Sequence, residues 1–417
     1  MPTKLKLISL FSGCGGMDYG FEAAGFETAV ALEMDHSCCE TLRKNRSWPV
    51  IEGDIFSMPT PRILAEAGLK RGAADLLIGG PPCQPFSKSG YWAKGDSARL
   101  KDPRADTLAA FMRVVEEAQP RAFVLENVTG LAYANKDEGL QYLLSQITAI
   151  NRRIGTNYRA HYTVLKAAEF GVPQIRERFF LVAARDGAYF EFPQPLFRAA
   201  AAREETGGMF KPPPLPPYRT AWDAIGDLPV SPKAEILAMT GRWADLLASI
   251  PEGNNYLWHT DRGGGLPLFG WRRRFWNFLL KLAKDRPSWT IQAQPGPSVG
   301  PFHWDNRRLS IRELCRLQTF PDDIEVTGNH RTAHKQIGNA VPSLLAEIIG
   351  RKVRTELLGA VPLSRPLKLL PLDRSPAPRA NAIKPVLAKY LSLVGDQSAH
   401  PGTGKGYAAQ AGFRVSA

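Results

Sequence analysis

Cys83 is the residue with the clearest capacity for covalent chemistry. It lies in residues 79–87 (Gly-Gly-Pro-Pro-Cys-Gln-Pro-Phe-Ser), where Pro81 and Pro82 fix the backbone immediately before it. A free cysteine is most often a buried core residue, but two preceding prolines are an unusual way to build a core position. This rigid presentation favours a nucleophile, which needs a nearby cation or positive dipole to lower the pKa of its thiol.

Two further segments carry charged side chains that could serve such a thiol. They are residues 126–128 (Glu-Asn-Val) and residues 174–178 (Gln-Ile-Arg-Glu-Arg). Arginine stays protonated, so Arg176 or Arg178 can stabilise a thiolate or a charge that develops on a substrate. A lone glutamate such as Glu126 more often caps a turn, and one or two of these residues could form surface ion pairs. Three of them at adjacent strand ends, beside a cysteine, indicate a site.

A glycine-rich turn and two acidic residues predict a nucleoside pocket. Residues 11–16 (Phe-Ser-Gly-Cys-Gly-Gly) form a tight turn where a ligand can approach the backbone. This is not the full dinucleotide-binding fingerprint, because Asp18 stands where the third glycine would be. Glu33 follows Gly13 by about 20 residues, where a carboxylate can accept hydrogen bonds from a ribose diol, and Asp54 could receive an adenine amino group. Either acid alone would be an ordinary polar residue at a strand end.

The elements that must position these residues read as an α/β fold. Short apolar runs bounded by Gly, Asp or Pro occupy residues 5–10, 28–32, 75–78, 122–125 and 178–183. Helical patterns lie between several of them, at residues 18–24, 37–45 and 106–118. Alternating strands and helices predict a mostly parallel sheet covered on both faces. Such a sheet places its ligands beyond the carboxyl ends of its strands, where the segments described above begin.

The composition of the chain changes near Phe192, where prolines become frequent. Residues 211–217 alone contain five prolines. We therefore expect a first unit over residues 1–190 and 328–360, and a second, smaller unit over residues 191–327 that is rich in Trp, Arg and Gly. A last helix is expected over residues 343–358. The Pro-, Gly- and Ala-rich remainder, residues 361–417, is expected to be a loosely ordered tail.

Composition excludes several classes of protein. A net charge of +13 favours a polyanionic partner such as nucleic acid, although a basic surface alone is common. The five cysteines are odd in number and lack metal-ligand spacing, which argues against a disulfide scaffold or a zinc site and fits a reducing cytoplasm. The apolar run near the N-terminus is too short for a signal peptide, and no run approaches the length of a membrane span.

Taken in order, these segments resemble the DNA cytosine-5 methyltransferase family, bacterial restriction-modification type, from residue 5 to about residue 358. Residues 11–16, Glu33 and Asp54 are similar to its first three cofactor motifs, and residues 79–87 to its Pro-Cys-Gln loop. The remaining similar segments are 126–128, 174–178, 308–313 with 316–321, and 336–342. The chain departs from the family pattern at Ser9, where many members carry Asp, and beyond Gly359, where no counterpart is assigned.

The resemblance implies a Rossmann-like, S-adenosylmethionine-dependent methyltransferase fold with a smaller target-recognition domain. It also implies that Cys83 adds to carbon 6 of a flipped cytosine, that Glu126 donates to N3, that Arg178 holds O2 and that Arg176 helps position the catalytic loop. The implied partner is double-stranded DNA, bound by a monomer that acts separately from any restriction endonuclease. The residues implied to bind S-adenosylmethionine are Phe11, Ser12, Gly13, Cys14, Gly15, Gly16, Glu33, Met34, Asp54, Ile55, Pro81, Asn339 and Val341.

Three alternatives stay open at this point. An RNA cytosine methyltransferase of the same fold is the nearest, because one branch of the family acts on transfer RNA; the long variable region rich in Arg and Trp favours DNA. A catalytically silent DNA-binding regulator is disfavoured by the intact Cys83, Glu126, Arg176 and Arg178. A nicotinamide-dependent oxidoreductase is more remote, because the glycine turn lacks its third glycine and no phosphate site follows.

Overall fold

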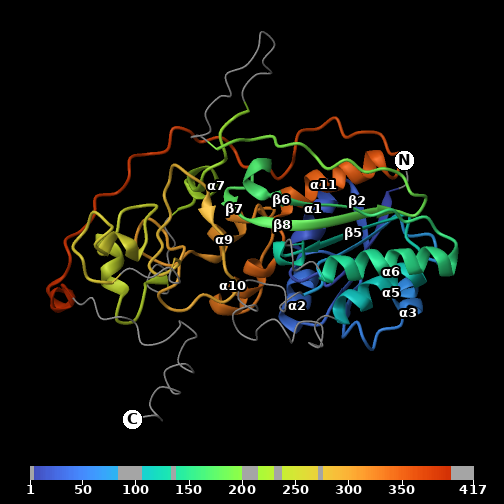
Figure 1. The fold of residues 1–417 in the computed structure, drawn as a ribbon, viewed down its shortest axis with the longest axis horizontal. Helices are drawn as coiled ribbons and strands as arrows, with labels where there is room; N and C mark the ends of the chain where they lie inside the picture. Colours follow the sequence, from blue (N-terminus) through green and yellow to red (C-terminus); the bar gives the residue numbers. More distant parts are fainter. Residues whose placement is uncertain are drawn as a thin grey trace, which may run out of the picture.

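A seven-stranded sheet forms the centre of the molecule (Figure 1). The computed structural model describes residues 4–82, 106–132, 138–199, 215–229, 237–270 and 276–395. The sheet order is β3-β2-β1-β4-β5-β8-β6, and β8 runs antiparallel to the other strands of the sheet. The strands are β1 (Leu5–Leu10), β2 (Phe26–Glu33), β3 (Val50–Glu52), β4 (Leu76–Gly79), β5 (Ala122–Asn127), β6 (His161–Lys166) and β8 (Glu177–Ala184). The predicted α/β class is confirmed.

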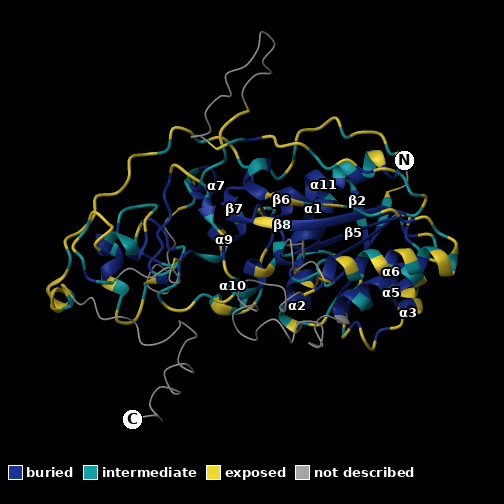
Figure 2. Ribbon diagram, in the orientation of Figure 1, coloured by how far each residue is buried: buried dark blue, intermediate teal, exposed yellow. Residues whose placement is uncertain are grey.

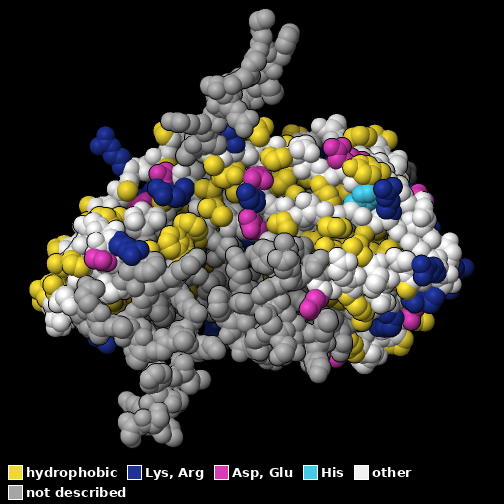
Figure 3. All heavy atoms as spheres, in the orientation of Figure 1, with side chains coloured by type: hydrophobic (Ala, Val, Ile, Leu, Met, Phe, Trp, Pro, Cys, Tyr) yellow, Lys and Arg dark blue, Asp and Glu magenta, His cyan; other side chains and the backbone are white. Residues whose placement is uncertain are grey.

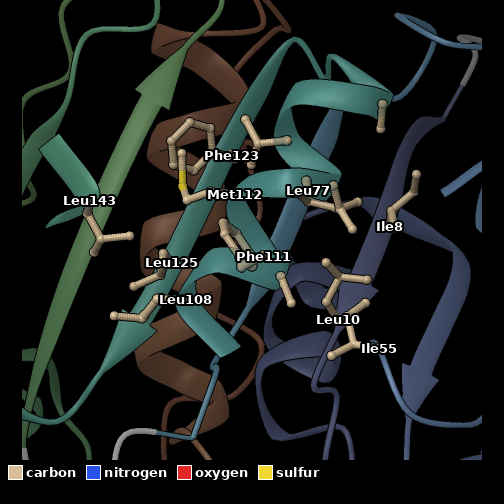
Figure 4. Close-up of a cluster of buried hydrophobic side chains, with 14 of the residues drawn as sticks. Ile8, Leu10, Ile55, Leu77, Leu108, Phe111, Met112, Phe123, Leu125 and Leu143 are labelled. Carbon is tan, nitrogen blue, oxygen red and sulfur yellow. The ribbon is translucent and has the colours of Figure 1, made fainter. Parts of the chain in front are cut away.

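Helices cover both faces of this sheet, as its apolar runs require. On one face lie α3 (Thr60–Glu66), α5 (Asp106–Ala118) and α6 (Glu138–Ile154); on the other lie α1 (Gly16–Ala23) and α11 (Ser343–Glu356). Side chains alternate along each strand, so Ile8 packs in the first layer and Leu7 in the second. Figure 4 shows the first layer, where Phe111 of α5 lies over the β1 and β4 side chains. Both layers are almost fully buried, which explains the continuous apolar runs (Figure 2).

The last helix returns the chain to its beginning, because α11 packs directly on α1. Two glycines of α1 allow this close approach. A side-chain carbon at Gly20 would lie 2.3 Å from the Ser343 carbonyl oxygen, and one at Gly16 would lie 2.6 Å from the Val341 carbonyl oxygen. The Ser343 hydroxyl also donates to the Gly16 carbonyl at 2.7 Å. The segment 336–342 is thereby held against the glycine turn.

The rest of the described chain forms a second lobe with little regular structure. A two-stranded parallel ladder of β7 (Gln174–Ile175) and β9 (Ser288–Trp289) joins it to the sheet domain. Its helices are α7 (Ala221–Ile225) and α9 (Ile311–Leu317), and α10 (His330–Asn339) leads back toward α2 (His36–Asn45). No helix in the described residues is both long and apolar enough to cross a membrane.

The segment expected to be a loosely ordered tail follows a defined path as far as residue 395. It runs from α11 along the length of the molecule and ends on the second lobe (Figure 1). Asn381 accepts a hydrogen bond from the buried Lys284 ammonium at 2.8 Å, and its backbone N–H donates to Glu252 at 2.8 Å. Tyr390 is 2% exposed within the core of that lobe. Apolar and ionic contacts that lie far away in sequence therefore hold this part of the tail.

Candidate active site

The approach to Cys83 is anchored at both of its prolines. Cys83 itself lies outside the residues that the structure describes. The Pro81 carbonyl accepts a hydrogen bond from the Asn127 side-chain amide at 3.1 Å. The Pro82 carbonyl accepts one from the Thr107 hydroxyl, also at 3.1 Å. The end of β5 and the start of α5 thus hold the backbone that leads into the cysteine.

Glu126 and Arg178 form an ion pair beside this approach. Their strands pair antiparallel, which brings the end of β5 to the start of β8. Arg178 Nε lies 2.8 Å from Glu126 Oε1, and the two side chains are only 14% and 10% exposed. A side-chain carbon at Gly80 would lie 2.9 Å from the Glu126 carboxylate, so only glycine fits there without displacing that carboxylate. The Glu126 carboxylate therefore lies directly against the backbone that precedes Pro81.

Burial governs the protonation of this pair. It raises the pKa of Glu126 above its ordinary value, although Arg178 and then Arg176 oppose the shift. It also lowers the pKa of Arg178, against the opposing effect of Glu126. A carboxyl with a raised pKa beside a fixed guanidinium can hold a proton and deliver it to a base.

Arg176 has a different environment from Arg178, although only one residue separates them. It is 2% exposed and donates to the Ile291 carbonyl at 3.2 Å and to the Gly338 carbonyl at 2.9 Å. Burial lowers its pKa well below the ordinary value, and the charge of Arg178 adds to this effect. One guanidinium thus joins the β7–β8 junction, the second lobe and α10.

Replacing Arg176 by lysine is expected to lower the free energy of unfolding by about 1–3 kcal/mol. Arg176 reaches the Ile291 and Gly338 carbonyls from two different nitrogens of its planar guanidinium. Lysine has one nitrogen in place of this fork, so we expect at least one of the two buried acceptors to lose its donor. Urea unfolding followed by fluorescence measures the change. Arg43→Lys on the exposed side of α2 is the matched control, with an expected change within about 0.5 kcal/mol. Equal effects of the two substitutions would contradict the joining role of Arg176.

The glycine turn has the backbone conformation that its sequence predicts. Phe11, Gly13 and Gly15 have φ values of +53°, +54° and +88°, in the left-handed region. A side-chain carbon at Gly13 would meet no atom within 4 Å, so the turn faces open space at this point. At the same turn, the Ser12 hydroxyl lies 2.8 Å from the Ser9 hydroxyl. The first strand therefore ends in an accessible turn lined by backbone and hydroxyl groups.

Glu33 is held rigidly at the end of β2. Its Oε2 accepts the Gly13 N–H at 2.7 Å, and its Oε1 accepts the N–H groups of Met34 and Asp35 at 2.9 and 2.8 Å. An ionised carboxylate has about four acceptor positions, so three such bonds leave room for a ligand donor. The glycine turn and Glu33 thus belong to one hydrogen-bonded unit.

The remaining residues expected to bind cofactor have mixed environments. Met34 is 69% exposed and Asp54 is exposed, whereas Ile55 and Val341 are buried and Asn339 is exposed at the end of α10. Asp54 accepts the Phe56 N–H at 3.0 Å, which fixes its carboxylate beyond β3. These side chains all lie around the ends of β2 and β3 or at the end of α10.

Packing accounts for three residues of the turn that the sequence assigned to ligand binding. The Cys14 side chain is 1% exposed in a cluster with Tyr19, and burial raises the pKa of its thiol. A side-chain carbon at Gly15 would lie 2.8 Å from the Tyr19 ring, and Gly16 contacts Val341 as described above. The Cys14 side chain therefore serves packing, and the absence of side chains at Gly15 and Gly16 allows the close contacts of the turn.

Two contacts of the site could not be predicted from the sequence. Gln174 donates from its amide to the Gln318 side chain at 3.0 Å and accepts the Ile291 N–H at 3.0 Å, which joins the sheet domain to the second lobe. Asn127 holds Pro81, as described above. Both residues belong to segments that the sequence analysis marked as candidate site segments. Their polar side chains were visible in the sequence, but the residues that they contact could not be predicted from it.

Known proteins are similar to this chain in sequence and in fold. The family model described as C-5 cytosine-specific DNA methylase matches residues 5–355. The Type II methyltransferase M.SacI of Streptomyces achromogenes is 40% identical over 380 residues, which are 86% of this chain and 94% of that protein. The Type II methyltransferase M.AquIA of Picosynechococcus is 45% identical over 237 residues, which are 56% of this chain and 93% of that protein.

Solved structures show the same fold at much lower identity. The methyltransferase EhMeth of Entamoeba histolytica has a TM-score of 0.57 at 13% identity, and the match covers 85% of this chain and 99% of that one. A DNMT2 mutant of Spodoptera frugiperda has a TM-score of 0.55 at 13% identity, and the match covers 83% of this chain and 98% of that one.

Proposed function

The chain belongs to the C-5 cytosine-specific DNA methylase family, and from this premise we propose that it methylates carbon 5 of cytosine within a specific double-stranded DNA sequence. The methyl donor in this proposal is S-adenosylmethionine, and the reaction proceeds through a covalent bond between Cys83 and carbon 6 of a flipped base. The observation that carries the proposal is the buried Glu126–Arg178 pair against the Pro81–Pro82 approach to that cysteine.

The described residues fit S-adenosylmethionine. The turn at Gly13 faces open space, where no neighbouring atom would meet an added side-chain carbon. Glu33 keeps acceptor capacity for a ribose, and Asp54 beyond β3 can accept from an adenine amino group. Met34, which directly follows Glu33, is exposed and offers an apolar surface. When bound, S-adenosylmethionine supplies an electrophilic methyl group on a sulfonium centre, which carbon 5 of the activated cytosine attacks.

Each polar residue of the pair then has a role toward the base. Cytosine carbon 5 is a poor nucleophile, so the Cys83 thiolate adds to carbon 6 and makes the ring an electron-rich enamine. Glu126 donates a proton toward N3 as negative charge develops there, and Arg178 holds O2. Arg176 secures the junction from which Arg178 projects. After methyl transfer, solvent water takes the carbon 5 proton, and the electrons of that C–H bond form the carbon 5–carbon 6 double bond. The Cys83–carbon 6 bond breaks at the same time and releases the thiolate.

A cytosine stacked in a duplex cannot reach this buried pair, so the base must be flipped out at a cost of a few kcal/mol. We assign the flipped base to the edge formed by β4, β5 and β8, within the domain of residues 1–190 and 328–360. Residues 191–327 are the proposed target-recognition domain. A net charge of +13 supports the binding of DNA phosphates. On the face seen in Figure 3, Lys and Arg side chains lie among acidic ones.

We also propose a place in a restriction-modification system, because relatives along most of the chain are named Type II methyltransferases. In this proposal the protein acts as a monomer, and a separate endonuclease cuts the same sequence when it is unmethylated.

The test is methyl transfer from radioactively labelled S-adenosylmethionine to duplex DNA and to transfer RNA, in parallel. Label in DNA that maps to carbon 5 of cytosine by bisulfite sequencing is the expected result. Label in RNA alone would overturn the choice of substrate. Absence of label from both, with the purified protein folded, would favour a silent DNA-binding regulator.

A further inference from the structure

Residues 365–391 of the tail form a strap along the outside of the molecule. The strap follows α11 and lies beyond residues 5–355, which the family model matches. Its last residues enter a short 3₁₀ helix, η8 (Ala388–Leu393), and the rest of it is extended. Ordering such a segment costs backbone entropy at every residue, so contacts with the rest of the chain must compensate for it. In Figure 1 the strap runs along the edge of the molecule opposite α2 and α10, and it reaches the far end of the second lobe.

The strap is anchored to the sheet domain at Glu347 of α11, a carboxylate that is 0% exposed. Glu347 Oε1 accepts the Lys368 N–H at 2.8 Å, and its Oε2 accepts the Leu369 N–H at 2.9 Å. Arg351, which pairs with the same carboxylate at 2.7 Å, donates to the Pro366 carbonyl at 2.6 Å. A buried carboxylate needs such donors around it, so this anchor fixes the backbone at the start of the strap.

The middle of the strap is anchored to α7 in the second lobe. The Arg374 N–H donates to the Asp223 side chain at 2.6 Å, and the Arg374 guanidinium donates to the Asp223 carbonyl. The same guanidinium lies 2.7 Å from the Asp227 carboxylate. This anchor lies near the junction of the two lobes, because α7 shares an apolar cluster with Cys14 and Tyr19 of the sheet domain.

The end of the strap is anchored to the far part of the second lobe, which has an apolar core of its own. The described side chains of that core come from residues 239–302 and from the tail, and none comes from the sheet domain. The tail contributes Tyr390, whose ring stacks on Trp243 with the two centroids 6.0 Å apart. The Tyr390 hydroxyl donates to the Arg242 carbonyl at 2.8 Å. The strap therefore completes the core of residues 239–302.

Asn381 adds a polar anchor to the same far part of the lobe. Besides its contacts with Lys284 and Glu252 described above, its side-chain amide donates to Asp305 at 3.0 Å. Lys284 and Glu252 lie 2.6 Å apart, and their side chains are only 6% and 5% exposed. Attraction between two buried charges compensates for their lost hydration only when further hydrogen bonds complete the site. Asn381 supplies such bonds to both charges, so the strap is fixed at a buried position.

These anchors connect the far core to α11 through one continuous backbone, in addition to the β7–β9 ladder at the junction. We propose that the strap fixes the orientation of residues 239–302 relative to the sheet domain, and that Arg374 and Asn381 are positioning residues for DNA methylation. The inference rests on the proposed function, in which a duplex contacts both lobes at once. A lobe that already has the binding orientation needs no ordering when DNA binds, whereas the DNA itself must order a released lobe.

Cutting the strap tests the proposal without removing any contact residue. A recognition site for a specific protease is inserted between Ala377 and Pro378, in a largely exposed stretch between the middle and end anchors. After cleavage the KM for duplex DNA should rise about five- to fiftyfold, because only a fraction of the molecules then has the binding orientation. At saturating DNA, kcat should stay within about threefold, and the affinity for S-adenosylhomocysteine within about twofold. The uncut protein is the matched control, and wild type treated with the protease controls for cleavage elsewhere.

Two substitutions in an intact chain give the result independently, also where gel filtration shows that the cut piece dissociates. Arg374→Ala combined with Asn381→Ala removes contacts at the middle and end anchors and should also raise the KM for DNA. Lys389→Ala, which breaks an exposed ion pair of the same strap, should leave that KM unchanged. Small-angle X-ray scattering of the free protein measures the arrangement of the lobes without any activity, and the radius of gyration should increase in the cut protein.

The possible outcomes separate the strap from the proposed function. An unchanged KM for DNA in both the cut protein and the double variant would refute the positioning role. Equal losses of kcat, DNA affinity and S-adenosylhomocysteine affinity would also refute it, because the strap would then stabilise the whole fold. If the uncut protein failed to methylate DNA while its radius of gyration still increased on cutting, the proposed function would be overturned and the strap would remain.

Discussion

Methyl transfer is expected to fall by roughly 10⁴- to 10⁶-fold when Cys83 is replaced by serine, as for other enzymes that lose a covalent nucleophile. A serine hydroxyl has no appreciable anion at neutral pH, so it cannot add to carbon 6 as a thiolate does. Binding of S-adenosylhomocysteine should stay near the wild-type value, because most of the proposed cofactor contacts lie at the ends of β1, β2 and β3 and not in the loop that carries Cys83. Label incorporation and calorimetry on the same preparation measure the two quantities.

The covalent step can be seen directly with a duplex that contains 5-fluorocytosine at the target position. The wild type should form a stable protein–DNA adduct, because fluorine at carbon 5 blocks the final elimination, and Cys83→Ser should form none. Cys315→Ser is the matched control: its thiol is buried in α9, burial raises its pKa to about 12, and it should trap DNA like the wild type. Substantial turnover by Cys83→Ser, or binding without an adduct in the wild type, would rule out the covalent route.

Replacing Glu126 by glutamine is expected to lower kcat by about 10²- to 10⁴-fold, the usual contribution of a general acid. Glutamine can still donate a hydrogen bond to N3, so the flipped base should bind, but it cannot transfer a proton as charge develops. Burial raises the pKa of Glu126, and in the proposed mechanism the protonated form is the active one. The wild-type rate should therefore fall as the pH rises through that pKa, and Glu126→Gln should lack this limb. Single-turnover rates across a pH series measure both effects.

Stability must be measured beside activity, because Glu126 also neutralises Arg178. Glutamine keeps an acceptor for the guanidinium, and the free energy of unfolding should fall by only about 1–3 kcal/mol. Glu117→Gln on the exposed side of α5 controls for loss of a carboxylate and should leave the rate unchanged. If Glu126→Gln retained kcat within about threefold while folded, the proton for N3 would have to come from another group.

Local sequence was sufficient to predict the strands of the central sheet that are buried on both faces. The run at residues 5–10 coincides with β1, and the runs at 28–32 and 122–125 lie inside β2 and β5. Such strands appear in the sequence as continuous apolar runs, because helices cover both faces of the sheet. Strand β6 has no continuous apolar run. It is an edge strand whose residues alternate between half-buried and exposed, apart from the buried Leu165. The three-residue β3 is too short to establish a pattern.

The sequence also determined which residues could carry the chemistry, because each group of them is contiguous in the chain. Glu33 lies at a spacing from Gly13 that the β1–turn–α1–β2 connection imposes. In the structure the Gly13 N–H donates to Glu33 Oε2 at 2.7 Å. Glu126, Arg176 and Arg178 stand in short polar segments between apolar runs, where strand ends were expected. Residue type and spacing therefore indicated a nucleoside pocket and a charged site before any fold was known.

Only the tertiary structure decided the partners of these residues. Arg176 and Arg178 are two positions apart, yet their partners differ. Arg176 donates to the carbonyls of Ile291 and Gly338, whereas Arg178 forms an ion pair with Glu126. That difference arises from the antiparallel pairing of β5 with β8 and from the packing of the second lobe on β7. Such contacts join residues distant in the chain and depend on how whole layers pack, which no local pattern encodes.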